Sequence, residues 1–182
     1  MQPKEPTPQY PADWERTGTT RDGISFRIRP IRPDDENRER QFIVRLSPES
    51  RYKRMMHAMK EPSPQLLHHF VHVDYKHEMA FVALIGAAPD EEIIGVARYS
   101  QDRNGPDCEF AVAVADAWQA RGVGATLTRL LFEYAHAQGI TKIYGEILAD
   151  NKQMIDLVLW LGMNTRMCPE DHTLVEASVT PV

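Results

Sequence analysis

Apolar residues recur at two different spacings along the chain, and the spacing predicts which segments are strands. Ile24, Phe26 and Ile28 alternate with polar residues, which is the period of a strand with one buried face. Later strands are indicated by short apolar runs that end at turn residues such as Pro, Gly and Asp. The predicted strands cover residues 24–31, 79–85, 93–100, 108–115 and 142–148, and a final hairpin covers residues 163–167 and 173–179.

Other apolar residues lie three or four positions apart and predict helices. Two of these helices begin with Ser followed by Pro, at Ser47 and Ser63, which places Pro in the first helical turn behind a good capping residue. Gly139 and Gly162 follow the last apolar positions of two others, where glycine commonly ends a helix. The predicted helices cover about 33–46, 47–56, 63–73, 121–138 and 151–161.

The order of these elements predicts the fold class. Three strands joined by short loops form an antiparallel meander, and a strand–helix–strand–helix–strand pattern follows. We therefore expect an α/β fold with a mixed sheet of six or seven strands, four or five helices and one right-handed parallel crossover. Four prolines stand among the first eleven residues, so residues 1–22 are predicted to form a flexible tail that Trp14 anchors on a single domain, residues 23–182.

Composition restricts the class of protein. The chain is 42% hydrophobic and 26% charged, as in ordinary globular proteins. Its 21 Lys and Arg against 26 Asp and Glu give a net charge of −5, which argues against nucleic acid as a partner because phosphate binding needs a basic face. No apolar run reaches the ~20 residues of a membrane span, and the N-terminus lacks the hydrophobic stretch of a secretory signal. With only two cysteines, the sequence predicts a cytoplasmic protein without a membrane partner.

One strand–turn–helix junction carries the strongest signal for chemistry. Helix N-termini bind anions through free N–H groups and the helix dipole, and glycines let a pyrophosphate approach the main chain. The alternative is a plain turn in which glycines relieve crowding. Arg121 is either a further cation at the phosphates or a solvated residue at the helix start. The junction comprises the strand residues Val112, Ala113 and Val114 and the turn residues Gln119, Ala120, Arg121, Gly122, Val123, Gly124 and Ala125.

Glu109 begins the same strand and is the candidate base. Strand alternation places it on the face opposite Cys108 and Phe110, with small alanines on its own face that leave an open floor beside the carboxylate. The alternative is a structural carboxylate paired with an arginine such as Arg98. An anion site beside a base suggests transfer of a group from a phosphate-bearing cofactor.

Two further clusters favour a structural interpretation. His68 and His72 have the spacing of a zinc-binding helix, with His69 and His77 nearby, but no carboxylate completes the metalloprotease pattern. We therefore interpret the histidines as a solvated helix face and expect no metal. The basic run 51–54 is interpreted in the same way, as a helix exterior rather than a binding surface for an acidic partner.

The Gln119-x-x-Gly122-x-Gly124 turn follows an apolar strand, and Asn151 stands at the next strand–helix junction. This pattern resembles the GNAT acyltransferase superfamily. More narrowly, the chain over about 24–163 looks like the acetyltransferase domain of bacterial protein lysine acetyltransferases, which modify acyl-CoA synthetases among other proteins. The segments that carry this likeness are Ile28-Arg-Pro-Ile-Arg-Pro-Asp-Asp-Glu, Leu46-Ser-Pro-Glu-Ser-Arg-Tyr, Asp74-Tyr-Lys-His-Glu-Met-Ala, Gly95-Val-Ala-Arg-Tyr, Glu109-Phe-Ala-Val and Tyr144-Gly-Glu-Ile-Leu-Ala-Asp-Asn.

The resemblance implies a donor, a reaction and residue roles. Acetyl-CoA is the expected donor, with its pyrophosphate on the amides of residues 121–125 and its pantetheine beside residues 112–114. Asn151 would face the pantetheine, a role compatible with capping a helix. Glu109 matches the general base that deprotonates the acceptor, which the resemblance implies is a protein lysine. A small-molecule amine as acceptor, or a non-catalytic acyl-CoA-binding module, are the alternatives.

The chain also departs from the family pattern. Many members place a Tyr, the acid for the leaving thiolate, where this chain has Val158. The loss is tolerable because a thiol with a pKa near ~8.5 leaves without assistance. Many relatives also carry a cyclic-nucleotide-binding or synthetase-like domain, for which 182 residues have no room.

Overall fold

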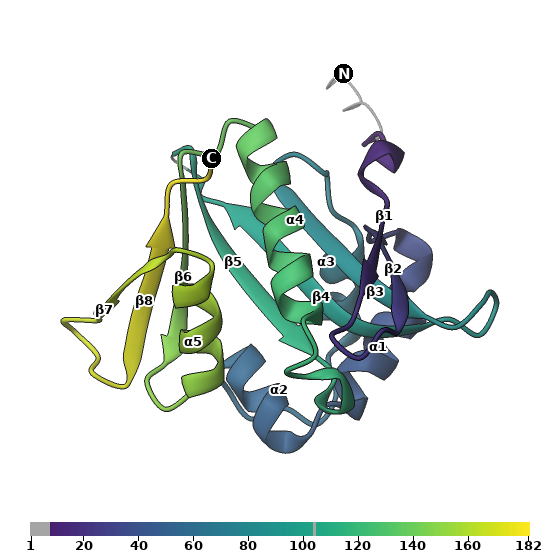
Figure 1. Ribbon diagram of the computed structural model, residues 1–182, viewed down its shortest axis with the longest axis horizontal. Helices are drawn as coiled ribbons and strands as arrows, with labels where there is room; N and C mark the ends of the chain where they lie inside the picture. Colours follow the sequence, from purple (N-terminus) through teal and green to yellow (C-terminus); the bar gives the residue numbers. More distant parts are fainter. Residues whose placement is uncertain (1–7, 104) are drawn as a thin grey trace.

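The structure is a computed structural model that describes residues 8–103 and 105–182, and within them the fold is built on one eight-stranded sheet (Figure 1). The strand order is β1-β2-β3-β4-β5-β6-β8-β7. Neighbouring strands are antiparallel except β5 and β6, which confirms the meander followed by a parallel crossover. The strands are β1 (Arg16–Thr19), β2 (Ser25–Pro30), β3 (Glu78–Ile85), β4 (Glu92–Gln101), β5 (Asp107–Val114), β6 (Lys142–Leu148), β7 (Asn164–Met167) and β8 (Leu174–Val179).

Helices cover both faces of this sheet. The predicted serine caps are confirmed, because the Ser47 and Ser63 hydroxyls accept the N–H groups of Ser50 and Leu66 at 3.1 and 3.2 Å. No helix within the described ranges is both long and apolar enough to cross a bilayer. The α-helices are α1 (Glu36–Arg45), α2 (Pro48–Met55), α3 (Pro64–Val71), α4 (Val123–Ala137) and α5 (Lys152–Trp160).

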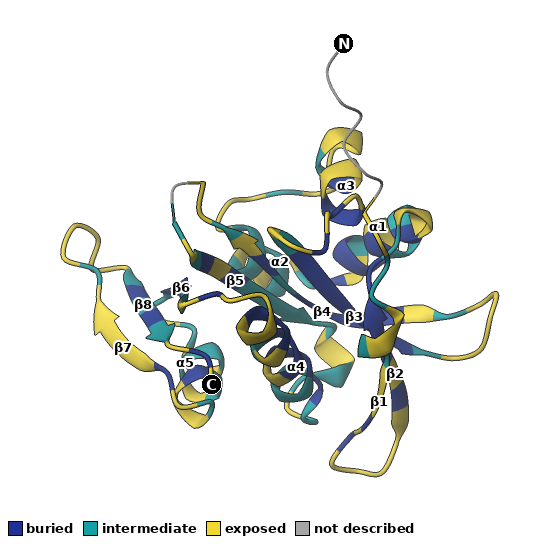
Figure 2. Ribbon diagram, turned by 90° about the horizontal axis from the view of Figure 1, so that it is seen from above, coloured by how far each residue is buried: buried dark blue, intermediate teal, exposed yellow. Residues whose placement is uncertain are grey.

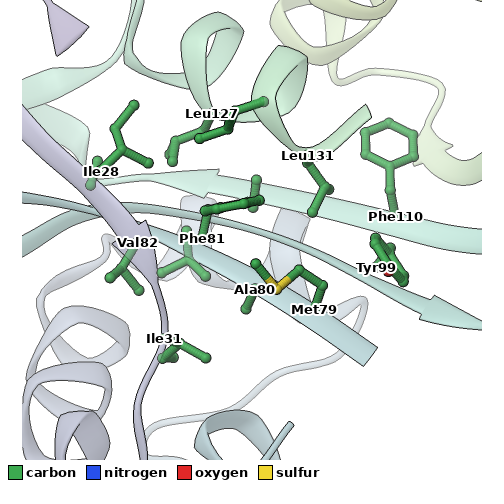
Figure 3. Close-up of a cluster of buried hydrophobic side chains, with 14 of the residues drawn as sticks. Ile28, Ile31, Met79, Ala80, Phe81, Val82, Tyr99, Phe110, Leu127 and Leu131 are labelled. Atoms are coloured by element: carbon green, nitrogen blue, oxygen red, sulfur yellow. The ribbon is translucent and has the colours of Figure 1, made fainter. Parts of the chain in front are cut away.

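The hydrophobic core lies where α4 packs on the middle of the sheet. Figure 2 shows α4 on one face of β3 and β4 and the helices α1 and α3 on the other. Leu127 and Leu131 of α4 lie over Phe81 of β3, and all three side chains are fully buried (Figure 3). Gly95 of β4 allows the close approach, because an added Cβ would lie 2.9 Å from a methyl group of Leu127.

The predicted tail is wrong for its last part. Residues 1–7 lie outside the described residues, but Arg16–Thr19 forms β1 and pairs with β2 at the edge of the sheet. This strand is the one that the predicted count of six or seven lacked. Trp14 anchors the segment as expected, with its ring edge-on to Tyr134 at 4.8 Å between centroids. The prolines precede the strand, so they do not interrupt its pairing.

The sheet opens between its two parallel strands. β5 and β6 pair only over three positions, the last of which joins Glu109 to Tyr144. Beyond Glu109 the two strands separate, so this edge of β5 has no strand partner up to Val114. Glu109 therefore lies at the point where the opening begins.

Candidate active site

A cavity of about 880 Å³ fills the opening between β5 and β6 and extends along α2, the start of α4 and one face of α5. All but two of the residues predicted for the site line it. The exceptions are Arg121 and Val123. The predicted residues that line the cavity are Glu109, Val112, Ala113, Val114, Gln119, Ala120, Gly122, Gly124, Ala125 and Asn151.

The glycine turn presents free main-chain donors to this cavity. Helix α4 begins after Gly122, whose φ of +93° is readily adopted only by glycine. The first intrahelical bond runs from the Thr126 N–H to the Gly122 carbonyl. The main-chain N–H groups of residues 122–125 therefore donate no hydrogen bond to any described residue. The side chain of Val123 points into the core, but its N–H is one of these donors. The helix dipole adds roughly half a positive charge here, so the arrangement suits an anion such as a pyrophosphate.

Gln119 holds the turn in place. Its side-chain amide donates to the Val114 carbonyl at 3.0 Å and to the Ser50 hydroxyl at 3.1 Å. Asp116 strengthens the same link by accepting hydrogen bonds from Ser47 and Ser50. These bonds tie the turn between β5 and α4 to the N-terminal end of α2. Gln119 is therefore a positioning residue that fixes the conformation of the glycine turn.

Arg121, which one interpretation of the sequence predicted as a phosphate cation, does not line the cavity in this structure. Its guanidinium donates to Asp22 at 3.2 Å and lies over the Trp118 ring, away from the cavity lining. Arg21 lines the cavity instead, with its main-chain N–H bonded to the Arg121 carbonyl and its side chain next to Gly122. The sequence analysis missed Arg21 because it assigned the residue to the tail. No local pattern marks it, since the pairing of β1 brings it here.

Glu109 has no hydrogen bond or ion pair to any described residue. The alternative pairing with Arg98 is wrong, because that guanidinium is bound to Glu39 at 2.9 Å. Cys108 and Phe110 are buried on the opposite face, as the alternation predicted. Partial burial and the nearby carboxylate of Glu146 raise the pKa of Glu109, against the opposing charge of Arg54. A carboxylate with a raised pKa accepts a proton more readily than an ordinary one.

The basic run 51–54 is more than a helix exterior. Arg51 donates to main-chain carbonyls of Ile43, Val44 and Leu46 at 3.1, 2.9 and 2.8 Å, so it joins α1 to α2. Arg54 turns inward and lines the cavity. Burial and the repulsion of the Arg98 guanidinium lower the pKa of Arg54 to about 10, so it remains a cation near Glu109 at neutral pH.

Asn151 combines the two roles that the sequence left compatible. Its side-chain carbonyl accepts the Met154 N–H at 3.3 Å and caps α5, while the residue lines the cavity. Val158 stands where many members of the family carry the Tyr that acts as an acid, and its side chain is fully buried. Among the described residues, no tyrosine lines the 880 Å³ cavity. The large cavity therefore holds the carboxylate of Glu109 but no phenol, whereas Tyr99 lines the smaller cavity beside it.

A second cavity of about 220 Å³ meets the first at Glu109. Arg54, Phe110 and Ala111 also line both, whereas Phe70, Glu78 and Arg98 belong to the smaller one. The carboxylate of Glu109 thus lies between a long chamber that ends at free amides and a small chamber of mixed charge.

The histidine cluster lies mainly outside these chambers. His68 and His72 stack with 3.7 Å between ring centroids, and His69 lies 3.6 Å from Glu78. Among the described residues, no group of three or more His, Cys, Asp or Glu side chains is arranged to hold a metal ion.

The sequence profile of the Acetyltransferase (GNAT) family matches residues 41–163, which contain both cavities' central residues. The chain belongs to this family. Membership confirms the expected acetyl-CoA-dependent acetyltransferase and the expected fold.

Individual relatives agree. The chain is 40% identical over 154 residues to Acetyltransferase PA5475 of Pseudomonas aeruginosa, covering 85% of this chain and 83% of that protein. It is 31% identical over 143 residues to Acetyltransferase Pat of Mycolicibacterium smegmatis, covering 78% of this chain but only 42% of Pat. Among solved structures, the GNAT domain of S. lividans PAT aligns over 94% of this chain and 99% of that domain, with a TM-score of 0.87 and 29% identity.

Proposed function

We propose that the protein transfers an acetyl group from acetyl-CoA to the ε-amine of a protein lysine, with Glu109 as the general base. The observation that carries the proposal is the position of Glu109, unpaired, between the two cavities. Likeness to relatives named Pat and PAT supports a protein acceptor. The two free cysteines, Cys108 and Cys168, fit a reducing cytoplasm as the place of action.

The large cavity suits the donor. Its pyrophosphate fits the amides of residues 122–125, with Arg21 as an added cation. From there the pantetheine leads into the opening, where the edge of β5 at residues 112–114 has peptide groups without a strand partner. A linear molecule with amide groups can pair with such an edge as an added strand does. This route ends with the thioester beside Glu109.

The small cavity suits a lysine side chain. Phe70 and Val73 offer apolar surface to an aliphatic stem, and the carboxylates of Glu78 and Glu109 attract an ammonium group. Arg54 keeps the charge of the chamber balanced and favours the ionised form of Glu109, which is the form able to accept a proton.

The reaction then needs one general base and main-chain hydrogen-bond donors for the oxyanion. A lysine ammonium, with a pKa near ~10.4, gives a proton to Glu109 directly or through water. The neutral nitrogen attacks the thioester carbon, and an N–H of β5 stabilises the oxyanion by about 3 kcal/mol. The C–S bond breaks, the nitrogen loses its second proton, and the CoA thiolate leaves and takes up a proton. The products are an acetylated amine and CoA, with one net proton released.

Incubation with radiolabelled acetyl-CoA and a cell extract tests this proposal. Labelled protein bands that disappear with Glu109→Gln support it. Label in small molecules assigns the acceptor to a free amine, which is the second candidate. Bound but unconsumed acetyl-CoA identifies a non-catalytic module, and label transfer that persists at the same rate in Glu109→Gln removes Glu109 from the base role.

A further inference from the structure

Trp160, at the C-terminal end of α5, is unusually exposed. The residue is 58% accessible, although a tryptophan ring gains more from burial than most side chains do. It lines the large cavity and lies one turn beyond Leu157, the residue of α5 that lies beside Gly124 at the start of α4. The guanidinium of Arg129 in α4 lies over the ring, with 4.2 Å between its carbon and the ring centroid. An indole with one face on a cation and much of its surface open is a platform for a flat ligand.

The cavity leads from the glycine turn to this platform. Helices α4 and α5 lie side by side and begin at the same end of the sheet (Figure 1). An added Cβ at Gly124 would lie 3.6 Å from Leu157, so the start of α4 touches the middle of α5. Gln153, Asp156 and Trp160 follow one another at helical spacing on the face of α5 that lines the cavity. The nine residues of this helix span about 13 Å.

The structure of acetyl-CoA implies that its adenosine needs a binding surface near Trp160. With its pyrophosphate at residues 122–125 and its pantetheine between β5 and β6, acetyl-CoA must direct its adenosine away from Glu109. That part of the molecule carries a purine, a ribose and a 3′-phosphate. A purine stacks on an indole, and a phosphate pairs with a guanidinium.

We propose that Trp160 and Arg129 form the adenosine subsite of acetyl-CoA, with adenine on the open face of the indole and the 3′-phosphate paired with Arg129. The proposal rests on acetyl-CoA as the donor. Arg129 is exposed and has no ion pair or hydrogen bond to any other described residue, so its charge is free for a ligand. Asp156, one turn earlier, repels a phosphate but accepts hydrogen bonds from ribose hydroxyls, which directs the phosphate toward Arg129.

Calorimetry with truncated donors tests the subsite without relying on turnover. Trp160→Ala should raise the Kd for acetyl-CoA about tenfold and leave the Kd for acetyl-phosphopantetheine, which lacks adenosine, unchanged. Trp160→Phe should recover part of the loss. Arg129→Gln should abolish the preference of the wild type for CoA over 3′-dephospho-CoA. Leu159→Ala, an exposed neighbour outside the cavity lining, is the matched control and should bind as the wild type does.

Three results would overturn the subsite. Trp160→Ala could weaken both donors equally, it could weaken neither, or Arg129→Gln could keep the full preference for the 3′-phosphate. Trp160→Ala that converts a dimer to a monomer with unchanged Kd values assigns the ring to a contact between copies and likewise overturns it. A wild type that fails to bind acetyl-CoA contradicts the donor itself, which separates failure of the proposed function from failure of the subsite.

Discussion

The two halves of the sheet are built for different purposes. In β3, the six residues from Met79 to Leu84 are all buried, β4 pairs with the whole strand on one edge, and β2 pairs with residues 81–84 on the other. In β5, the residues from Ala111 to Val114 are only partly buried, and one edge lacks a partner after Glu109. Unpaired peptide groups along the edge of β5 cost stability, and they persist because the closed half is well packed. The difference teaches that stability and chemistry are separated along one sheet.

Truncation in the closed half should have the largest effect on stability. Phe81→Ala removes a fully buried ring beneath α4, and such cavities cost about 3–5 kcal/mol. Urea unfolding followed by circular dichroism should show this loss in the free energy of unfolding. Leu159→Ala, at a position that is 50% exposed, should change it by less than about 0.5 kcal/mol. Similar losses for both variants would show that β3 is not the stabilising half.

Removing the proposed base in the open half should lower activity strongly and leave stability unchanged. Glu109→Gln should lower kcat by about a hundredfold, equivalent to about 2.7 kcal/mol, while the Kd for acetyl-CoA hardly changes. Since the folded protein raises the pKa of Glu109, the group binds protons more tightly when folded, and its contribution to stability is lost as the pH rises through the folded value. At neutral pH the variant should therefore be no less stable than the wild type. A clear loss of stability would give Glu109 a structural role.

The acid limb of the pH–rate profile tests whether the ionisation of Glu109 controls activity. Activity should fall below the raised pKa of Glu109, and Glu146→Gln should move this limb to lower pH because it removes a carboxylate that raises the value. A limb that does not move with Glu146→Gln would indicate that another group controls it.

Most of the closed half could be predicted from local patterns. The serine caps, the period-two strand at 25–30 and the glycine just past the end of α4 are each signalled by a few neighbouring residues, and the structure confirms them. Such signals depend on backbone geometry that neighbouring residues decide.

The site was predictable where it depends on one segment and not where distant segments meet. The turn at 119–125 and Glu109 share one strand–turn–helix unit, so their common cavity followed from the sequence. Arg21 and Arg54 reach the same cavity from the turn after β1 and from α2, through tertiary packing that no sequence spacing records. The pairing of Arg98 with Glu39, rather than with Glu109, was invisible for the same reason.

Two glycines with similar backbones allow the anion cradle to be tested against simple strain. Gly122 and Gly139 have φ values of +93° and +80°, one at the start of α4 and one just past its end. Alanine at either position should cost about 1 kcal/mol of stability, because the left-handed conformation disfavours a Cβ. Only Gly122→Ala should also raise the Kd for acetyl-CoA, by about tenfold, because Gly122 lines the cavity and its added Cβ would lie beside Arg21, another lining residue. Equal binding by the two variants in calorimetry would contradict the cradle.

The smallest effect is expected where the turn after β5 is joined to the start of α2. Asp116 accepts hydrogen bonds from the Ser47 amide and from the Ser47 and Ser50 hydroxyls, at 3.0, 2.7 and 2.8 Å, and these bonds lower its pKa. Asp116→Asn should cost about 0.5–1 kcal/mol at neutral pH, discounted for the exposure of the site. Because the folded pKa is lowered, this contribution is present above the ordinary value of 3.8 and is lost as the pH falls through the folded value. Urea unfolding at pH 7 and at pH 3 should therefore show the difference between variant and wild type shrinking in acid, whereas a constant difference would mean that the side-chain charge plays no part in holding α2 against the turn.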